Sequence, residues 1–546
     1  MQGIGVSPGI SIGKAHVLRQ QKSVASGVVL ADEAAVQREI ENFREAVRVS
    51  IADVQRLVDE AVEEEKDILE VQLELLQDPQ LESDVLERIN GDKMTARDAM
   101  LVVTERAVQV FAQMDDEYLS ARGADVQDAG NRIVKNLSRS TEEPAELGDE
   151  LILIAEDLSP SDTIGMDRSK IFGFATQIGG RTSHVAIVAR LRGLPAVVGC
   201  GDALSVIVDG DLVILDGDEG LVLVNPTAAE VEDYRKKREI FIGESRRLES
   251  LRDRLAITTD GVKIELLANI ASADDLDQAL NFGAEGVGLF RTELLFMARN
   301  SFPTEEEQFD FYKTILLRAK DKPVTIRTLD IGGDKHLPYF GLPEEENPFL
   351  GYRAIRISLD RPDIFRTQLR AILRASVFGK CRILLPMIGS VKEVQQAKLI
   401  IEETKKELAA KDLAFDGAIA VGIMIELPSA AITADLLAKE VDFFSIGTND
   451  LCQYVLAVDR MNEKIKELYD PYHPAVLRLI QYVIEQGHLH GLPVGMCGEL
   501  AGDPQATSLL LGMGLKEFSM AAPSIPVIKD ILMRSSVEKA RKNFRL

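Results

Sequence analysis

Residues from about 256 to the end of this 546-residue chain alternate between short apolar segments and helix-like stretches. This alternation constrains the fold more than any other feature of the chain. Eight segments qualify as strands: Ile264–Ile270, Val287–Arg291, Val324–Leu329, Cys381–Met387, Val421–Ile425, Phe443–Ile446, Pro493–Cys497 and Glu517–Met520. Eight β/α repeats in about 290 residues predict a (β/α)₈ barrel, whose active site is formed by the residues just after the strands.

The residues before the barrel show two different patterns. Short apolar runs among glycines occupy about the first 25 residues and resume near Glu150, which is typical of the strands and turns of one small domain. Between them, residues of about 31–140 contain little glycine and carry apolar side chains at spacings of three and four. We therefore predict an inserted bundle of about four helices. A charged helical pattern after Asn225-Pro226 is interpreted as a linker.

Together these patterns predict a multidomain α/β protein. Its 46% apolar and 28% charged residues are ordinary for a soluble globular chain. The predicted parts are a mixed α/β domain (1–27 and 142–226), an inserted helical domain (28–141), a helical linker (227–255) and the barrel (256–546).

The chain is strongly acidic, with 63 basic and 88 acidic side chains and a net charge of −25. Such a surface repels nucleic acid and anionic membranes and attracts basic proteins. Residues 31–140 hold 26 acidic against 13 basic side chains, which is about half of the net charge. A solvated helical surface is the usual reason for such a run, and a docking face for a basic partner is the alternative.

The sequence also indicates a compartment. No apolar run approaches the ~20 residues of a membrane span, and the first residues lack the pattern of a signal peptide. The four cysteines, Cys200, Cys381, Cys452 and Cys497, are far apart and form no metal-type pair or disulfide framework, which fits a reducing compartment. We therefore expect a cytoplasmic protein without membrane insertion or a nucleic-acid partner.

Charged side chains recur just after the predicted barrel strands. Arg291 and Arg327 lie at the second and third strands, and Arg460 follows the sixth. Guanidinium groups bind phosphate or carboxylate through paired hydrogen bonds, so arginines facing one cavity predict an anionic substrate. Glu426 and Asp450 follow adjacent strands and offer the oxygen ligands that suit Mg²⁺. Each residue alone would usually belong to a surface ion pair, but together they predict a site for a phosphorylated acid.

Two cysteines lie near strand ends. A cysteine in such a place is by default a small buried apolar residue. Cys497 follows the seventh strand beside the predicted metal and arginines, where a thiol could exchange a proton with a substrate carbon. Cys452, two residues after Asp450, is interpreted as structural.

A second candidate site lies in the first domain at His184, which follows Gly-Gly-Arg-Thr-Ser. The hydroxyls of Thr182 and Ser183 suit a helix N-cap, and apolar spacing after His184 suits a helix. A helix N-terminus favours an anion and lowers the basicity of a histidine, leaving a neutral nucleophilic nitrogen. A lone histidine is usually structural, but this setting favours one that accepts and carries phosphate.

These motifs resemble those of the Enzyme I family, the phosphoenolpyruvate-protein phosphotransferases of the bacterial phosphotransferase system. The sequence Gly-Gly-Arg-Thr-Ser-His at 179–184 is similar to the family's phosphohistidine loop. Stretches similar to its substrate motifs occur at 283–293, 327–335, 347–356, 442–460 and 496–502. The resemblance runs over nearly the whole chain, including the inserted helical segment.

The resemblance implies a swivelling phosphohistidine domain, a helical insert that binds the carrier protein HPr, and a barrel that binds phosphoenolpyruvate with Mg²⁺ and forms a homodimer. His184 would attack the phosphorus, become a phosphohistidine and pass the phosphoryl group to a histidine of HPr. Pyruvate would be released, as the first step of sugar uptake by this system. A small domain on a helical linker suits the required motion.

Site residues carry over where the motifs match. The resemblance implies that Arg291, Arg327 and Arg460 hold the phosphate and carboxylate of the substrate. Asn449 would hydrogen-bond the substrate. Asp450 would do so through its backbone, while its side chain binds the metal.

The remaining matches concern the metal, the proton and the histidine. Glu426 would be the other metal ligand, and Cys497 would protonate the enolate carbon to give pyruvate. Thr163 would steady the ring of the phosphorylated histidine. Arg353 and Lys335 would be second contacts to the substrate.

Three neighbouring interpretations compete with this one. A pyruvate phosphate dikinase or phosphoenolpyruvate synthase relative would need an ATP-binding domain, and no nucleotide-binding glycine loop precedes residue 179. A non-catalytic, phosphate-dependent binding module is disfavoured by the intact set of His184, Glu426, Asp450 and Cys497. A paralogue serving a nitrogen-type phosphorelay would differ in the carrier protein that accepts the phosphate.

Overall fold

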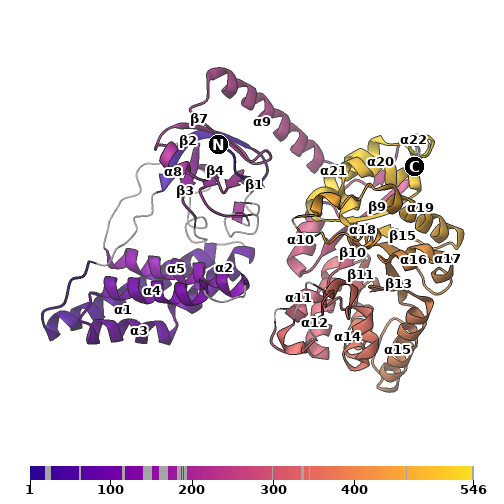
Figure 1. Ribbon diagram of the computed structural model, residues 1–546, viewed down its shortest axis with the longest axis horizontal. Coiled ribbons are helices and arrows are strands. Elements are labelled where there is room, and N and C mark those ends of the chain that lie inside the picture. The colour runs from indigo at the N-terminus through magenta and orange to yellow at the C-terminus, as the bar shows by residue number, and fades with distance from the viewer. Residues whose placement is uncertain are drawn as a thin grey trace. The chain divides into compact units, whose positions relative to one another are not determined.

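The structure is a computed structural model. It describes the chain apart from residues 19–25, 61–62, 113–116, 139–149, 159–169, 181–185, 187, 190–192, 298, 334–336, 343–344, 461, 463 and 544–546, and apart from the side chains of 59–60, 63–68, 110, 112, 117–122, 124–125, 338 and 543. It divides into two compact units, Met1–Glu244 and Ser245–Leu546 (Figure 1).

The first unit contains a mixed sheet whose described strands run in the order β1-β5-β4-β3-β2-β6-β7. The strands are β1 (Ile4–Ser7), β2 (Ile10–Leu18), β3 (Leu151–Ala155), β4 (Ile171–Thr176), β5 (Ala196–Val198), β6 (Leu212–Asp216) and β7 (Leu221–Val224). Strands β2 to β5 pair in parallel, and β1, β6 and β7 add antiparallel edges. Because β2 pairs directly with β3, the segments before and after the helical stretch share one sheet.

Helices occupy the sequence between β2 and β3. They are α1 (Glu33–Glu60), α2 (Glu63–Leu76), α3 (Pro79–Gly91), α4 (Ala96–Ala112) and α5 (Glu117–Leu137). Their apolar faces meet in a separate core that includes Phe43, Leu69 and Ile133. At the start of α3, the Asp78 side chain accepts a hydrogen bond from the Gln80 N–H, and Pro79 takes the first helical position.

Helix α9 (Ala228–Glu249) spans the boundary between the two units, after the short α8 (Ala203–Val206). Among its residues only Tyr234 is buried, in a cluster with Ile12 and Ile214 of the first sheet. Near its other end, Arg247 forms an ion pair with Asp530 of the second unit. A helix that is polar on most of its surface suits a solvent-exposed connection.

Within the described part of the second unit, eight parallel strands close into a barrel, in which β10 pairs with β9. The strands are β9 (Lys263–Ile270), β10 (Val287–Phe290), β11 (Val324–Arg327), β12 (Cys381–Leu385), β13 (Ala420–Ile425), β14 (Phe444–Ile446), β15 (Val494–Met496) and β16 (Glu517–Met520); the short β8 (Ala256–Ile257) pairs antiparallel with β9. Each predicted segment overlaps one barrel strand. The predicted multidomain α/β class and (β/α)₈ barrel are confirmed.

Helices surround the barrel strands (Figure 1). The longer ones are α10 (Ala273–Asn281), α12 (Glu305–Ala319), α14 (Pro362–Ala375), α15 (Val391–Ala410), α18 (Thr448–Leu456), α19 (Pro474–Leu489), α20 (Pro504–Met513) and α21 (Ile525–Arg534). The shorter ones are α11 (Glu293–Met297), α13 (Ile355–Asp360), α16 (Pro428–Ile432), α17 (Ala434–Leu437) and α22 (Val537–Asn543). Strand residues facing the helices join one large core.

Alternate residues along the strands point into the barrel, and some of the apolar ones form a second, small cluster. Its members are Leu289, Leu384, Met424, Phe443 and Cys497. This interior cluster therefore reaches from the middle of the strands to Cys497, which directly follows β15.

A pair of glycines offers a test of this interior packing. A Cβ added to Gly422 of β13 would lie 2.5 Å from the ring of Phe443, which is buried and has the Arg382 guanidinium over it. We expect Gly422→Ala to lower the free energy of unfolding by about 1–3 kcal/mol, because the ring cannot move without displacing its neighbours. Urea unfolding of the full chain measures this value.

Gly417, in the turn before β13, is the matched control. A Cβ there would meet no atom within 4 Å. Gly417→Ala should leave stability unchanged or raise it by up to ~1 kcal/mol, through the lower entropy of the unfolded chain. Equal unfolding free energies for the two variants would contradict the interior packing described above.

Candidate functional site

The carboxyl ends of the barrel strands carry a connected set of buried charges. Arg327, the last residue of β11, is 6% exposed. Its Nη2 donates to Oε1 of Glu293 at 2.5 Å, and its Nη1 lies 3.0 Å from Oδ2 of Asp330. Burial alone would lower the pKa of Arg327, but Glu293 and Asp330 outweigh it and raise that pKa. The guanidinium is thus fully charged and held in one orientation.

Arg353 extends this network toward β14. Its Nη2 lies 3.0 Å from Oδ1 of Asp330 and 3.4 Å from Oδ2 of Asp450. Its Nη1 donates to the Tyr454 hydroxyl at 3.2 Å, which in turn donates to the Phe349 carbonyl at 2.6 Å. Asp330 therefore bridges the guanidinium groups of Arg327 and Arg353.

Glu426 follows β13 and is 1% exposed. Its Oε1 accepts a hydrogen bond from the Met387 N–H at 2.5 Å, and Met387 has a positive φ of 54° that is uncommon for its residue type. Burial, together with the negative charges of Asp450 and Asp330, raises the pKa of Glu426 to about 8. Two carboxylates that repel each other inside a barrel would be stabilised by a cation.

The donor set fits Mg²⁺. Glu426 and Asp450 come from adjacent strand ends, and both present carboxylate oxygens, which this hard cation prefers. Among the described residues, no group of three His, Cys, Asp or Glu side chains is arranged to hold a metal ion. Two protein carboxylates would leave the other coordination positions to water and substrate oxygens, as Mg²⁺ sites usually do.

Asn449 and Arg460 lie beside these carboxylates. Nδ2 of Asn449 donates to Oε1 of Glu499 at 2.9 Å, and Oδ1 of Asn449 accepts from the Glu499 N–H at 2.8 Å. Nη2 of Arg460 is 3.8 Å from Oδ1 of Asp450. The Tyr469 hydroxyl donates to the Asn449 carbonyl at 3.2 Å. These contacts fix the first turn of α18 against the segment that follows β15.

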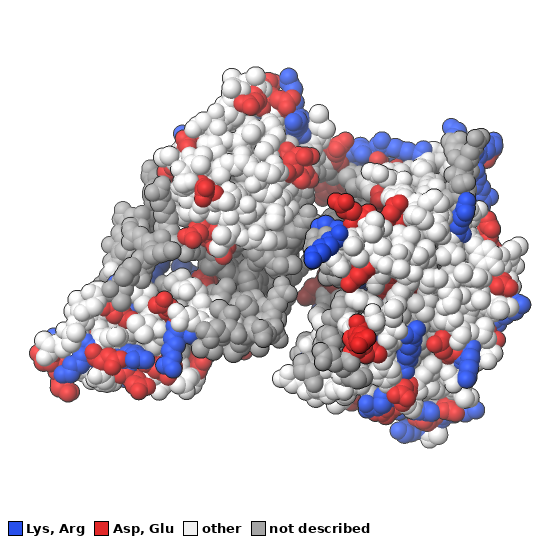
Figure 2. Space-filling model, in the orientation of Figure 1, with Lys and Arg blue, Asp and Glu red and all other residues white. Residues whose placement is uncertain are grey.

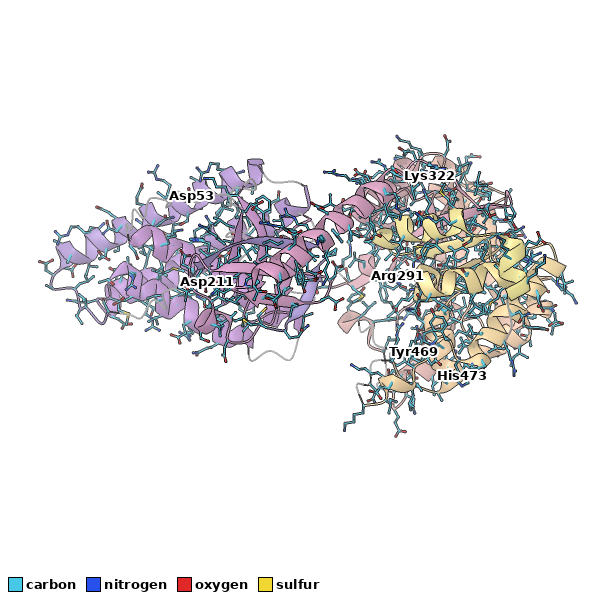
Figure 3. All side chains as sticks on the ribbon, turned by 90° about the horizontal axis from the view of Figure 1, so that it is seen from above. Asp53, Asp211, Arg291, Lys322, Tyr469 and His473 are labelled. Carbon is cyan, nitrogen blue, oxygen red and sulfur yellow. The ribbon has the colours of Figure 1, made fainter. Side chains whose placement is uncertain are left out.

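Arg291 follows β10 and is exposed. It lines a cavity of about 240 Å³ together with Asn269 and Asp275, at the carboxyl ends of β9 and β10. Figure 3 labels Arg291 and Tyr469 on the same side of the barrel. Arg291 is therefore at the same end of the barrel as the charged network, but it forms no ion pair with the residues that the structure describes.

Cys497 is 3% exposed and lies where the charged network meets the apolar interior. The Ser445 hydroxyl donates to its Sγ at 3.2 Å. Burial raises the pKa of the Cys497 thiol to about 11. The thiol consequently keeps its proton near neutral pH, as a proton donor must.

Several buried polar atoms of the site are unpaired. Within the described residues, Nε of Arg327, Nε of Arg353 and the hydroxyls of Thr328 and Thr448 are buried without a hydrogen-bond partner. Buried polar groups normally have one, so a cluster of four at the strand ends points to a ligand or ordered water there.

The structure describes some of the predicted site residues and leaves others out. The structure brings together Arg327, Arg353, Glu426, Asp450 and Arg460, whereas His184, Thr163 and Lys335 lie outside the described residues. Cys452 is fully buried in the core between strands and helices, in keeping with a structural role.

The sequence patterns missed the roles of Glu293, Asp330 and Tyr454. Glu293 and Asp330 also follow strands, and that position was the signal that could have singled them out. Their pairing with particular arginines depends on side-chain geometry, which the pattern does not contain.

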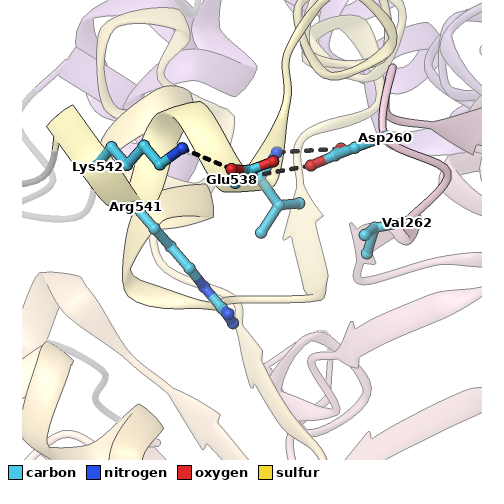
Figure 4. Close-up of a pocket in the computed structure, with 6 residues that line it drawn as sticks. Asp260, Val262, Glu538, Arg541 and Lys542 are labelled. Carbon is cyan, nitrogen blue, oxygen red and sulfur yellow. Dashed lines mark hydrogen bonds and ion pairs between the residues drawn. The ribbon is translucent and has the colours of Figure 1, made fainter.

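A larger cavity, of about 470 Å³, lies away from this site, before β9 and beside α22 (Figure 4). There Asp260 accepts hydrogen bonds from the Val537 and Glu538 N–H groups at 3.1 and 2.9 Å, and Lys542 pairs with Glu538. Hydrogen bonds, first from Thr258 and then from the Glu538 N–H, lower the pKa of Asp260. Its carboxylate caps the start of α22.

Three family models of phosphoenolpyruvate-utilising enzymes match the chain. The N-terminal model matches residues 2–122, the mobile-domain model 147–220 and the PEP-binding-domain model 245–537. The barrel with its charged strand ends is thus the PEP-binding domain of a phosphoenolpyruvate-utilising enzyme.

Curated relatives narrow this class. Phosphoenolpyruvate-protein phosphotransferase of Haemophilus influenzae is 46% identical over 99% of this chain and 95% of its own length, and that of Bacillus subtilis has the same identity and coverage. An NMR solution structure of Enzyme I is 40% identical, covering 44% of this chain and 99% of its own, with a TM-score of 0.38. The chain belongs to the phosphoenolpyruvate-protein phosphotransferase family. The predicted family and enzyme class are confirmed, and no described helix is long and apolar enough to cross a membrane.

The raised pKa of Cys497 leads to a test. Because the thiolate is the reactive form, the rate of alkylation of Cys497 by iodoacetamide should rise about tenfold for each pH unit between pH 7 and pH 10. Peptide mass spectrometry after timed quenching measures the rate at each cysteine. Cys381, whose pKa burial raises to about 12, is the control in the same chain and should react more slowly. A rate for Cys497 that levels off below pH 9 would contradict the assignment.

Proposed function

We propose that this enzyme transfers the phosphoryl group of phosphoenolpyruvate to His184 and then to a histidine of the carrier protein HPr, releasing pyruvate in the first step of sugar uptake. The observation that carries the proposal is the buried charge network at the strand ends, with Cys497 beside it. Phosphoryl transfer depends mainly on positioning and charge neutralisation, and this network supplies both.

Arginines bind the substrate in this proposal. Phosphoenolpyruvate carries a phosphate and a carboxylate, and Arg291, Arg327 and Arg460 hold these two groups, with Arg353 as a second contact. Arg291 is exposed and Arg460 is only loosely paired with Asp450, so both have donors to offer. Arg327 is already fixed by Glu293 and needs no rearrangement when the substrate arrives.

The first turn of α18, which follows β14, completes substrate and metal binding in this proposal. Asn449 hydrogen-bonds the substrate, and Asp450 does so through its backbone. Glu426 and the Asp450 side chain hold Mg²⁺, and the raised pKa of Glu426 supports this role. The bound cation would neutralise charge on the substrate oxygens.

The chemistry divides between two residues. A neutral nitrogen of His184 attacks the phosphorus, the bond from phosphorus to the C2 oxygen breaks, and the enolate of pyruvate remains. Cys497 then gives its thiol proton to C3, which yields pyruvate, and solvent returns a proton to the thiolate. The high pKa of the thiol supports this assignment, because it keeps the proton in place until the enolate forms.

In this proposal, each domain predicted from the sequence has one role in phosphoryl transfer. Residues 1–27 and 142–226 form the swivelling phosphohistidine domain, in which Thr163 steadies the ring of His184. Residues 227–255 form the linker, and 256–546 form the PEP-binding and dimerisation domain, to which Lys335 adds a substrate contact. The location is the cytoplasm. The polar helix α9 supports the linker role.

The helical insert, 28–141, is the docking site for HPr in this proposal. Support comes from its excess of 13 acidic over basic side chains in residues 31–140, which would attract a carrier with a basic face. On the face drawn in Figure 2, the acidic side chains of the helical insert are interspersed with basic ones. Recognition would then need a particular pattern of charges in addition to the net charge.

Intact-protein mass after mixing with phosphoenolpyruvate and Mg²⁺ tests the proposal. We expect one acid-labile phosphoryl group on the wild type and none on His184→Ala, because the imidazole is the acceptor. His490→Ala, which removes an exposed histidine of the barrel, is the control and should be phosphorylated like the wild type.

Each other outcome has a distinct meaning. No addition to the wild type would contradict the enzyme mechanism and favour a phosphate-dependent binding module. Equal addition to the wild type and His184→Ala would retain the enzyme but reject His184. Adding purified HPr to the phosphorylated enzyme then tests the partner, since the mass of the phosphoryl group should move to the carrier.

A further inference from the structure

Ser445 lies in the middle of β14 and is buried inside the barrel, next to the proposed proton donor. Strands β14 and β15 pair in parallel with Ser445 opposite Gly495. Cys497 is two residues beyond Gly495, so both side chains point to the same, inner side of the sheet. The Ser445 hydroxyl meets Sγ of Cys497 at 3.2 Å and is its donor.

The main chain of Cys497 is held independently of this contact. Its N–H donates to the Ile446 carbonyl at 3.0 Å, and its carbonyl accepts from Nδ2 of Asn269 at 2.9 Å. Oδ1 of Asn269 accepts in turn from the Ser519 hydroxyl at 2.7 Å. With the backbone fixed, the thiol can still move by rotation of its side chain, and the hydrogen bond from Ser445 restricts that rotation.

The sulfur has few other polar neighbours. In the described part of the chain, its other hydrogen-bond contact is the Ile446 carbonyl, to which the thiol donates at the longer distance of 3.8 Å. The ionisable groups that act on it electrostatically are Arg327, Glu426 and Arg291. Its apolar neighbours belong to the interior cluster, which includes Leu289 and Met424.

A serine is a costly choice for packing alone at this position. Burying a hydroxyl in an apolar interior is unfavourable unless the hydroxyl is hydrogen-bonded, and an alanine would fill nearly the same space without that cost. A thiol is a weak hydrogen-bond acceptor, but a thiolate is a strong one. The Ser445 donor therefore contributes most when Cys497 has lost its proton.

We propose that Ser445 is a positioning residue for Cys497: the Ser445 hydroxyl orients the thiol by donating to its sulfur, and it stabilises the thiolate after proton donation. In that step the S–H bond breaks, a C–H bond forms at C3 of the enolate, and the electron pair stays on sulfur until solvent returns a proton. The inference rests on the proposed role of Cys497.

Proton transfer can be measured apart from phosphoryl transfer. The unphosphorylated full-length enzyme with Mg²⁺ should exchange the methyl hydrogens of pyruvate for deuterium in D₂O, which ¹H NMR follows. Phosphoenzyme formation from phosphoenolpyruvate, followed by quenched mass measurement, reports the other half of the reaction. We expect Ser445→Ala to slow deuterium exchange about 10- to 100-fold, as for loss of a hydrogen bond to a charged group, and to slow phosphorylation far less.

Matched variants separate positioning from packing. Ser445→Thr keeps the hydroxyl and should restore most of the exchange. Ser376→Ala removes a buried hydroxyl that donates to the Leu373 carbonyl and accepts from the Asp416 N–H at the amino-terminal side of β12, and it should leave both rates unchanged. Thermal unfolding of every variant shows which of them are folded.

The outcomes distinguish the two proposals. If Cys497→Ala abolishes exchange but Ser445→Ala exchanges within twofold of the wild-type rate, the proposed role of Ser445 is overturned. The proposed role of Cys497 would then still hold. Undiminished exchange in Cys497→Ala would reject Cys497 as the proton donor and the role of Ser445 with it. Equal slowing in folded Ser445→Ala and Ser445→Thr would assign the effect to packing and also overturn the inference.

Discussion

The site depends on the two ion pairs that Asp330 makes with the buried guanidinium groups of Arg327 and Arg353. Arg327 lies between Glu293 and Asp330, and Arg353 lies between Asp330 and Asp450. A buried charge is strongly destabilising when unpaired, so each member of this chain of alternating charges requires its neighbours. The same pairing holds the arginines in place before any substrate arrives, which is the condition for electrostatic stabilisation without reorganisation.

Backbone conformation supports this arrangement. Met387 and Ala354 have positive φ values of 54° and 51°, and each is next to a member of the network: the Met387 N–H bonds to Glu426, and Ala354 follows Arg353. Gly332 has a φ of 105°, and a Cβ there would lie 2.5 Å from Cβ of Arg353. Such conformations cost on the order of 1–3 kcal/mol each for residues with side chains, and they persist where the surrounding structure enforces them. The tightly packed core between strands and helices provides that enforcement.

The barrel was predictable because each β/α repeat carries its own pattern of apolar residues. The fold then makes the strand ends the place to look, which is why Glu426 and Asp450 could be predicted as neighbours. Glu293 and Asp330 follow strands as well, but which arginine each one pairs with is settled by side-chain geometry. Ser445 carried no signal at all, since it lies within an otherwise apolar strand segment. His184 and the domain boundaries remain predictions from motif and composition.

The position of Cys497 joins two environments that the proposed reaction requires. Neutralising a phosphate needs fixed charges, whereas the burial of Cys497 raises the pKa of its thiol, so the site combines a charged and an apolar environment. Position along the strands separates the two environments, because the apolar cluster of Leu289, Met424 and Phe443 lies within the barrel and the charged groups lie at the carboxyl ends of the strands. Cys497 belongs to that cluster, yet it follows β15 directly and so lies at its upper edge. The thiol at this boundary therefore lies between the charged strand ends and the apolar interior, with the Ser445 hydroxyl as a hydrogen-bond donor to its sulfur.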